Sequence, residues 1–181
     1  MNNNIPILFF MVGLPASGKS TYAKELSKDY NAIICSSDEI RKELCGDENS
    51  QDKNNEVFIV LHRRIKEYLK SGKNVIYDAT NVNSKRRKAF LDELKNISCK
   101  KTCVIMATRY EDCLKRNALR DRVVPEEVIT RMYLNWNTPY YFEGWDDISI
   151  KYDTEEKDLI YEWISKYKYY DQSNPHHSKT L

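Results

Sequence analysis

The chain has 181 residues, of which 41% are hydrophobic, 31% are charged and 12% are aromatic. This length fits one domain with a sizeable core, and the apolar content excludes a chain that is disordered throughout. The net charge is only +2, but residues 84–122 hold twelve Lys/Arg against five Asp/Glu, whereas residues 123–181 hold six against eleven. The basic segment is either a set of solvated helix faces or a wall that binds phosphate.

Membrane insertion, secretion and disulfide formation are all disfavoured by the sequence. The longest apolar run covers residues 5–14, far short of the ~20 residues that a membrane-spanning helix needs. The first four residues lack the basic start of a secretory signal, so we expect a cytoplasmic protein without membrane contact. The five cysteines are an odd number, and we expect free thiols in a reducing compartment. Cys99 and Cys103 lie four residues apart, but no second ligand pair has the spacing of a zinc site.

The first elements have the order strand, glycine loop and helix. Residues 5–12 are apolar apart from Pro6 and end at Gly13, which is typical of a strand buried on both faces of a parallel sheet. Small and apolar residues at helical spacing then predict a helix over 19–27.

Strands and helices alternate along the rest of the chain. In chain order we predict a strand over 31–35, helices over 39–44 and 55–70, a strand over 74–77, a helix over 84–96 capped by Ser84, a strand over 102–107, helices over 111–120 and 126–137, a strand over 148–152 and a helix over 155–167. This alternation predicts an α/β fold with a parallel sheet and helices on both of its sides.

The segment from Gly13 to Ser20 has the spacing G-x-x-x-x-G-K-S between a strand and a helix. Glycines let backbone N–H groups wrap phosphates, the helix N-terminus adds a positive dipole, and Lys19 reaches the β- and γ-phosphates. The Ser20 hydroxyl is placed to coordinate Mg²⁺. We therefore predict that ATP or another nucleoside triphosphate binds with Mg²⁺ at Gly13, Pro15, Ala16, Ser17, Gly18, Lys19, Ser20 and Thr21.

Asp38 stands just after the second predicted strand, at the sheet edge where ligands of parallel sheets gather. It is a candidate general base for an attacking hydroxyl. Arg41, on the same helical face, is a candidate for holding an anionic part of the acceptor. The alternatives are a helix cap for Asp38 and a surface arginine for Arg41.

Asp78 ends the third predicted strand, where a carboxylate can orient Mg²⁺-bound water or another catalytic side chain. Its alternative is a turn residue. Thr80 and Asn81 follow, and with Arg86 and Arg87 they are candidates for contacting the acceptor. The two arginines belong to a basic run that either tracks a phosphate backbone or coats a helix.

Arg116 and Arg120 lie four residues apart, which places both on one side of the helix predicted over 111–120. Such a helix can close as a lid over the triphosphate and stabilise the charge that develops during transfer. The alternative is an exposed basic helix. His62 is interpreted as a surface or boundary residue. Four aromatic residues could stack bases, but we interpret them as core and helix packing; they are Tyr140, Tyr141, Phe142 and Trp145.

Four motifs, GLPASGKST, SSDEIR, YDATNVNSKRR and LKRNALRDRVVPEEVITRMY, together resemble the kinase module of 5′-hydroxyl polynucleotide kinases, as in phage and bacterial end-healing kinase-phosphatases. The resemblance covers roughly residues 5–145, and with it we expect the P-loop kinase fold, with five parallel strands in the order 2-3-1-4-5, flanking helices and a helical lid. It implies transfer of the γ-phosphate of ATP to a 5′-hydroxyl end of RNA or DNA, in the cytoplasm of a bacterium or a phage-infected cell. The basic segment fits this activity, because strand phosphates need cationic walls.

The same resemblance implies roles for individual residues. Asp38 matches the general base, Arg41 the contact to the acceptor phosphate, and Arg116 and Arg120 the lid arginines that bind the nucleotide. Lys19 and Ser20 match the phosphate-loop pair. Asp78 matches an acid that some members shift by one residue.

Residues 1–167 make up the expected kinase domain. The tail at 168–181 contains NPHHSKTL, which resembles the approach to an HD-type metal phosphohydrolase domain. We therefore expect the kinase module of a longer kinase-phosphatase, with a plain disordered terminus as the alternative. Two rival functions stay open, a small-molecule kinase such as an antibiotic or sugar phosphotransferase and a non-catalytic nucleotide switch or adaptor. Related P-loop kinases of aminoacyl-tRNA share most of the same outline.

Overall fold

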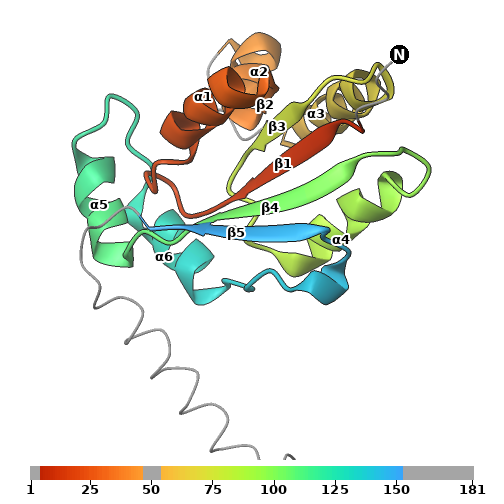
Figure 1. Ribbon diagram of the computed structural model, residues 1–181. Helices are drawn as coiled ribbons and strands as arrows, with labels where there is room; N and C mark the ends of the chain where they lie inside the picture. The colour runs from red at the N-terminus through yellow and green to blue at the C-terminus, as the bar shows by residue number, and fades with distance from the viewer. Residues whose placement is uncertain (1–4, 47–53, 153–181) are drawn as a thin grey trace, which may run out of the picture.

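The structure is a computed structural model that describes residues 5–46 and 54–152. Its sheet has five parallel strands in the predicted order, β2-β3-β1-β4-β5. The strands are β1 (Ile7–Val12), β2 (Ile33–Ser36), β3 (Val75–Asp78), β4 (Lys100–Met106) and β5 (Asp147–Lys151). The central strand β1 pairs with β3 on one side and with β4 on the other (Figure 1).

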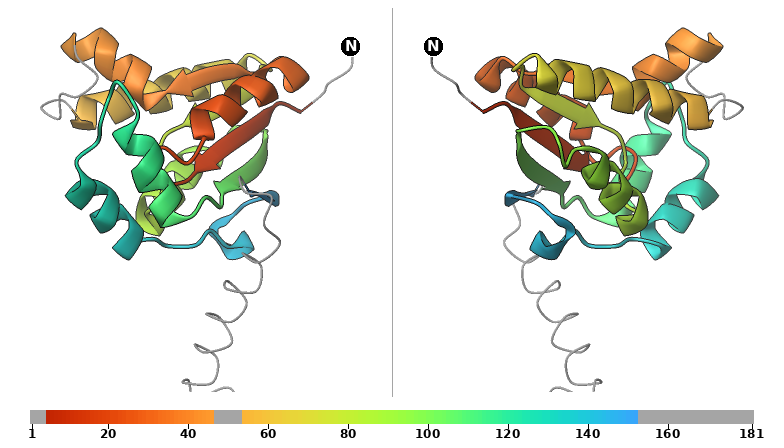
Figure 2. Two further views of the ribbon diagram at one scale, coloured as in Figure 1. Left: turned by 90° about the vertical axis from the view of Figure 1, so that its left-hand side faces the viewer. Right: turned by 90° about the vertical axis from the view of Figure 1, so that its right-hand side faces the viewer.

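Helices cover both faces of the sheet and its carboxyl edge. They are α1 (Lys19–Tyr30), α2 (Ser37–Cys45), α3 (Asn54–Lys70), α4 (Ser84–Glu93), α5 (Tyr110–Ala118), α6 (Glu126–Leu134) and the short 3₁₀ helix η1 (Tyr141–Glu143). α1 packs on one face and α3 with α4 on the other, whereas α5 and α6 lie beyond the carboxyl ends of β1 and β4 (Figures 1 and 2). No helix in the part of the chain that the structure describes is long and apolar enough to span a bilayer.

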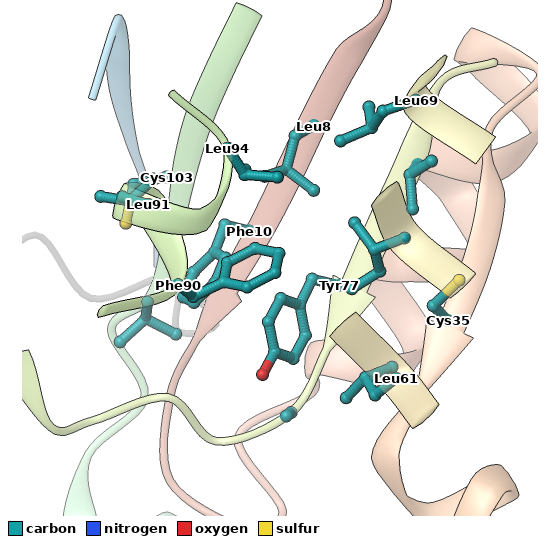
Figure 3. Close-up of a cluster of buried hydrophobic side chains, with 14 of the residues drawn as sticks. Leu8, Phe10, Cys35, Leu61, Leu69, Tyr77, Phe90, Leu91, Leu94 and Cys103 are labelled. Atoms are coloured by element: carbon teal, nitrogen blue, oxygen red, sulfur yellow. The ribbon is translucent and has the colours of Figure 1, made fainter. Parts of the chain in front are cut away.

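Alternating side chains of β1 build two separate cores. Leu8 and Phe10 pack against α3 and α4, in a cluster that also holds Tyr77 and Phe90 (Figure 3). Phe9 and its β1 neighbours on the opposite face pack against α1. Burying a side chain such as Leu8 or Phe10 stabilises the fold by about 1.5–3 kcal/mol. The two cores hold the carboxyl ends of the strands in place, and the functional residues extend from those ends.

Several predicted element ends are wrong by a few residues. Asn83, and not Ser84, is the N-cap of α4, because its side-chain Oδ1 accepts from the Arg86 amide at 3.0 Å. α4 ends at Glu93 and α6 at Leu134, both earlier than predicted. The helix predicted over 155–167 and the tail at 168–181 lie outside the described residues.

Of the four aromatic residues interpreted as core and helix packing, only Trp145 belongs to the buried core. Trp145 is buried and contacts Phe10 at a ring-centroid distance of 5.0 Å. Tyr140, Tyr141 and Phe142 are instead exposed, at 42%, 61% and 77%. The difference is that Trp145 immediately precedes the β5 region and faces the sheet, whereas the other three lie on and beside the η1 turn. The five cysteines are free thiols, four of them buried.

Candidate active site

The phosphate loop joins β1 to α1 and has the backbone shape of an anion site. Gly18, the N-cap of α1, and Ala16 adopt left-handed conformations, with φ of 88° and 61°. A Cβ at Gly13 would lie 2.6 Å from Ser17 Oγ, so glycine is required there by close approach. This geometry turns successive N–H groups inward at a helix N-terminus, where phosphate is bound favourably.

Lys19 is buried at the base of this loop. Its Nζ donates to the carbonyl oxygens of Gly13 at 3.0 Å and Leu14 at 2.7 Å. Burial lowers the pKa of Lys19 to about 8, although the nearby carboxylate of Asp78 opposes the shift. A third, longer contact joins Nζ to Ser17 Oγ at 3.4 Å. A buried ammonium held by neutral oxygens gains much from an anion, so Lys19 is suited to bind triphosphate oxygens.

Ser20 and Asp78 provide the oxygen ligands that Mg²⁺ prefers. Ser20 Oγ donates to Asp78 Oδ2 at 2.7 Å, which joins the start of α1 to the end of β3. Burial raises the pKa of Asp78, an effect opposed by the Ser20 hydrogen bond and by Lys19. Among the described residues no cluster of three or more His, Cys, Asp or Glu could hold a metal ion. One carboxylate and one hydroxyl nevertheless fit Mg²⁺, which takes its remaining ligands from water and phosphates.

Asp38 lies in the first turn of α2, where the Ser36 side chain caps the helix by accepting from the Asp38 amide. Its carboxylate contacts two arginines, Arg41 Nη1 at 2.9 Å and Arg122 Nη1 at 2.7 Å. The side chain is 46% exposed, so the carboxylate can still accept a further hydrogen bond. Asp38 therefore lines the cleft with a carboxylate that a further donor can reach.

Arg41 is the inner partner of Asp38 and is buried. Its Nη2 donates to Asn54 Oδ1 at 2.9 Å, which ties α2 to the first residue of α3. The buried Nε of Arg41 makes no hydrogen bond to any of the residues that the structure describes. A guanidinium with a spare buried donor is able to take an additional anionic oxygen.

The basic segment after α5 differs from the prediction. α5 ends at Ala118, so Arg116 lies on the helix and Arg120 lies in the segment after it, and the prediction that one helix carries both is wrong. Arg120 is still close enough to affect the pKa values of both Lys19 and Asp78. The three arginines Arg116, Arg120 and Arg122 line the same cleft as the phosphate loop.

Asn117 holds this segment in place. It is buried, its Nδ2 donates to the Val124 carbonyl at 2.8 Å, and its Oδ1 accepts from the Val124 amide at 3.0 Å. These two hydrogen bonds close a loop over residues 118–123. Neither Asn117 nor Arg122 was identified from the sequence, although Arg122 lies two residues beyond a predicted lid arginine and could have been included on that ground.

The residues that follow β3 have mixed placements. Thr80 accepts from the Gly13 amide through its carbonyl oxygen at 3.0 Å, and Asn81 donates through Nδ2 to the Met11 carbonyl at 2.9 Å. Both line the cleft, but these contacts tie the β3 end to β1 and the phosphate loop. Arg86 is exposed and lines the cleft.

The prediction that Arg87 contacts the acceptor is wrong. Its side chain is fully buried and forms a two-point ion pair with Glu143, with Nε and Nη2 donating at 2.8 and 2.7 Å. Nη1 donates to the Asn81 carbonyl at 3.0 Å. Arg87 points inward because consecutive helix positions face different directions, and the local sequence did not show which one faces the core.

Lys19, Ser20, Asp38, Arg41, Asp78 and the arginines Arg116, Arg120 and Arg122 surround one cleft of about 2090 Å³ at the carboxyl edge of the sheet. The cleft is bounded by the phosphate loop, α2, α3, α4, the segment after α5 and α6. With its sheet order, phosphate loop and paired Ser20 and Asp78, the domain has the P-loop kinase fold.

The chain belongs to the AAA_33 family, described as an AAA domain, whose model matches residues 8–139. It is 32% identical over 161 residues to the L-seryl-tRNA(Sec) kinase of Methanococcus maripaludis, which covers 83% of this chain and 60% of that protein. It is 28% identical over 179 residues to mouse heterogeneous nuclear ribonucleoprotein U-like protein 2, which covers 89% of this chain and 23% of that protein. The chain thus spans less than two thirds of these relatives.

One solved structure with the same fold is that of a Pnkp1/Rnl/Hen1 RNA repair complex. The TM-score is 0.62 at 24% identity, over 74% of this chain and 45% of that chain. This likeness concerns the fold.

Proposed function

We propose that this chain carries a kinase module that transfers the γ-phosphate of ATP to a 5′-hydroxyl end of RNA or DNA. The observation that carries the proposal is the Asp38 carboxylate, held by Arg41 and Arg122 in the same cleft as Lys19 and Ser20. A phosphate site alone would suit any nucleotide-binding protein. A carboxylate positioned by guanidiniums beside that site is what phosphate transfer to a hydroxyl requires.

The proposed reaction uses the chain's own residues in four roles. Asp38 accepts the proton of the acceptor hydroxyl. The hydroxyl oxygen bonds to the γ-phosphorus, and the bond between the γ-phosphorus and the ADP oxygen breaks. Arg41 keeps the carboxylate oriented and binds an acceptor phosphate. Lys19 binds the triphosphate oxygens, and the arginines Arg116 and Arg120 stabilise the charge that develops on the transferred group. Mg²⁺, when bound at Ser20 and Asp78, offsets phosphate charge.

The size and lining of the cleft favour a large, anionic acceptor. Small-molecule sites usually enclose about 300–1,000 Å³, whereas this cleft holds about 2090 Å³. Cations line it on both sides, including Arg63 and Arg86 away from the transfer centre and Arg131 on α6. These features support a nucleic acid over a sugar or an antibiotic.

A second candidate acceptor is the serine hydroxyl of an aminoacylated tRNA. The 32% identity to the archaeal L-seryl-tRNA(Sec) kinase is the observation that favours it. In both cases the hydroxyl is attached to a nucleic acid, so the same cationic cleft serves either acceptor. The candidates differ in where the hydroxyl lies, at a 5′ end or on an amino acid at a 3′ end.

The deciding experiment is a transfer assay with γ-labelled ATP and four acceptors, namely 5′-hydroxyl RNA, 5′-hydroxyl DNA, seryl-tRNA and a small sugar alcohol. The proposal expects label on RNA or DNA that carries a 5′-hydroxyl, and none on the same strand with a 5′-phosphate. Label on seryl-tRNA alone would replace the proposal by the second candidate. Label on the sugar alone, or ATP binding with no transfer to any acceptor, would overturn both.

A further inference from the structure

The cleft extends beyond the transfer centre, between α3 and α4. Phe58, Ile59 and Arg63 line it from α3, and Arg86 and Ala89 line it from α4. Phe58 is half-buried and packs on the core with one side, while Ile59 is 67% exposed. This part of the cleft is therefore apolar along its wall and cationic at its mouth.

A hydrogen-bond network gives this wall a fixed shape. His62 Nδ1 lies 3.0 Å from Glu93 Oε1, His62 Nε2 lies 3.0 Å from the Tyr77 hydroxyl, and Lys66 Nζ lies 2.5 Å from Glu93 Oε2. A carboxylate can only accept, so Nδ1 donates to Glu93 and the Tyr77 hydroxyl donates to Nε2. Burial lowers the pKa of His62, in keeping with this neutral form.

Both ring nitrogens of His62 are engaged in these hydrogen bonds. The α3 side of the cleft, at Phe58 and His62, therefore presents aromatic carbon. The His62 ring lies 6.2 Å from Phe58 and 4.3 Å from Phe90, centroid to centroid, so His62 joins Phe58 to the packed rings of the core. A rigid, half-buried aromatic ring in a polar cleft is a stacking surface, and every nucleobase has a flat face that can use it.

The cations beside this wall complete a nucleotide-sized site. Within residues 5–46 and 54–152, neither Arg63 nor Arg86 forms an ion pair. Both are solvent-exposed and line the cleft. Guanidiniums not engaged by carboxylates are available to strand phosphates.

A chain of contacts leads from the transfer centre to the helix that carries Phe58. Arg41 contacts Asp38 and also donates to Asn54, which is the first residue of α3. Phe58 lies four residues after Asn54, so it is on the same helix face one turn further, about 5.4–6 Å along the axis. Asp38 and Phe58 line the same cleft, so an acceptor end whose 5′-oxygen is at Asp38 can extend along α3 toward Phe58.

We propose that the 5′-terminal nucleobase of the acceptor stacks on Phe58, and that Arg63 and Arg86 bind the phosphates that follow it. This inference rests on the proposed function, because it requires a nucleic-acid acceptor. Recognition by stacking is tolerant of base identity, so the site binds any of the bases at the 5′ end and distinguishes a nucleotide end from an end that lacks a base.

The test compares two acceptors in wild-type, Phe58→Ala and Phe58→Leu chains. One acceptor is a 5′-hydroxyl oligonucleotide, and the other is the same strand with an abasic residue at its 5′ end. Loss of one stacking contact is expected to raise KM for the base-bearing acceptor about 5- to 150-fold in Phe58→Ala. The abasic acceptor should have the same KM in all three chains. Phe58→Leu keeps more of the core packing, so it serves as the test if Phe58→Ala unfolds. It should also raise KM for the base-bearing acceptor only.

Matched controls use residues that do not line the cleft. Phe142→Ala removes an exposed aromatic ring and should leave both KM values unchanged, and Lys95→Ala should leave the salt dependence of binding unchanged. Arg63→Ala and Arg86→Ala should each reduce that salt slope by about one. If the Phe58 variants change KM equally for both acceptors, or change neither, the stacking site is overturned. Phosphorylation of the oligonucleotide would then still support the proposed function. Failure to phosphorylate any oligonucleotide would overturn the proposed function itself.

Discussion

Oδ2 of Asp38 lies 2.7 Å from Nη1 of Arg122, so an ion pair joins the start of α2 to the segment that follows α5. Arg41 holds the other oxygen of the same carboxylate at 2.9 Å. An acceptor hydroxyl that donates to Asp38 therefore shares the carboxylate with two guanidiniums or displaces Arg122. Under the proposed function, this arrangement would couple the entry of an acceptor to the position of the basic segment that lines the same cleft.

Replacing Asp38 by Asn should separate binding from transfer. The amide keeps the shape of the side chain but cannot take a proton, so we expect transfer to fall about 10²–10⁴-fold with ATP affinity unchanged. Steady-state transfer to the acceptor identified in the labelling assay and calorimetric titration with ATP measure the two quantities. Glu39→Gln, the neighbouring exposed acid on α2, is the control and should be normal. Near-wild-type turnover in Asp38→Asn would rule out its role as base.

ATP affinity should weaken as the pH rises through the pKa of Lys19. That pKa is about 8 because the amine is buried, and only the protonated form carries the charge that attracts the triphosphate. Above pH 8 the apparent Kd should rise by up to about tenfold per pH unit, and binding should take up a proton. Calorimetry at pH 7–9.5, in buffers of different ionisation enthalpy, measures both effects. Lys19→Met should bind weakly with no such pH dependence, and an identical slope in that variant would assign the titration to another group.

Asn117 should act as a positioning residue for Arg120 and Arg122. Asn117→Ala removes both hydrogen bonds to Val124 and frees residues 118–123, so we expect kcat to fall about 10²-fold. Asn117→Asp still accepts from the Val124 amide, so its kcat should lie between those of the wild type and Asn117→Ala. Thermal unfolding serves as the structural readout and Asn96→Ala, an exposed amide after α4, as the control. A loss of kcat that tracks thermal stability alone across these variants would contradict the positioning role.

Replacing the neighbours Arg86 and Arg87 by alanine should change the free energy of unfolding to very different extents. Arg87→Ala leaves Glu143 buried without its partner, and we expect a loss of about 3–5 kcal/mol in the free energy of unfolding. Arg86→Ala, at an exposed site, should change stability by less than about 0.5 kcal/mol. Chemical denaturation of both variants measures the difference. Equal stability of the two variants would mean that the Glu143 pair contributes little to the fold.

The sequence by itself determined the features that depend on local spacing. The phosphate loop needs glycine at fixed positions between a strand and a helix, and alternation of strands with helices restricts the sheet to a parallel α/β type. Asp38 and Asp78 could be singled out as candidates because each stands at or just beyond the end of an apolar strand, and the carboxyl ends of parallel strands lie at one edge. Position along the chain was sufficient for these groups.

Only the tertiary structure decided which neighbours of these groups face the cleft. Arg86 and Arg87 are adjacent in the chain, yet one lines the cleft and the other is buried against Glu143, 56 residues further on. Arg122 meets Asp38 across 84 residues, and Phe58 faces the cleft because α3 packs beside α4. Such contacts depend on how helices pack over the sheet, and that packing follows from the whole core. The spacing of residues in one segment sets only which of them share a face of a helix or strand.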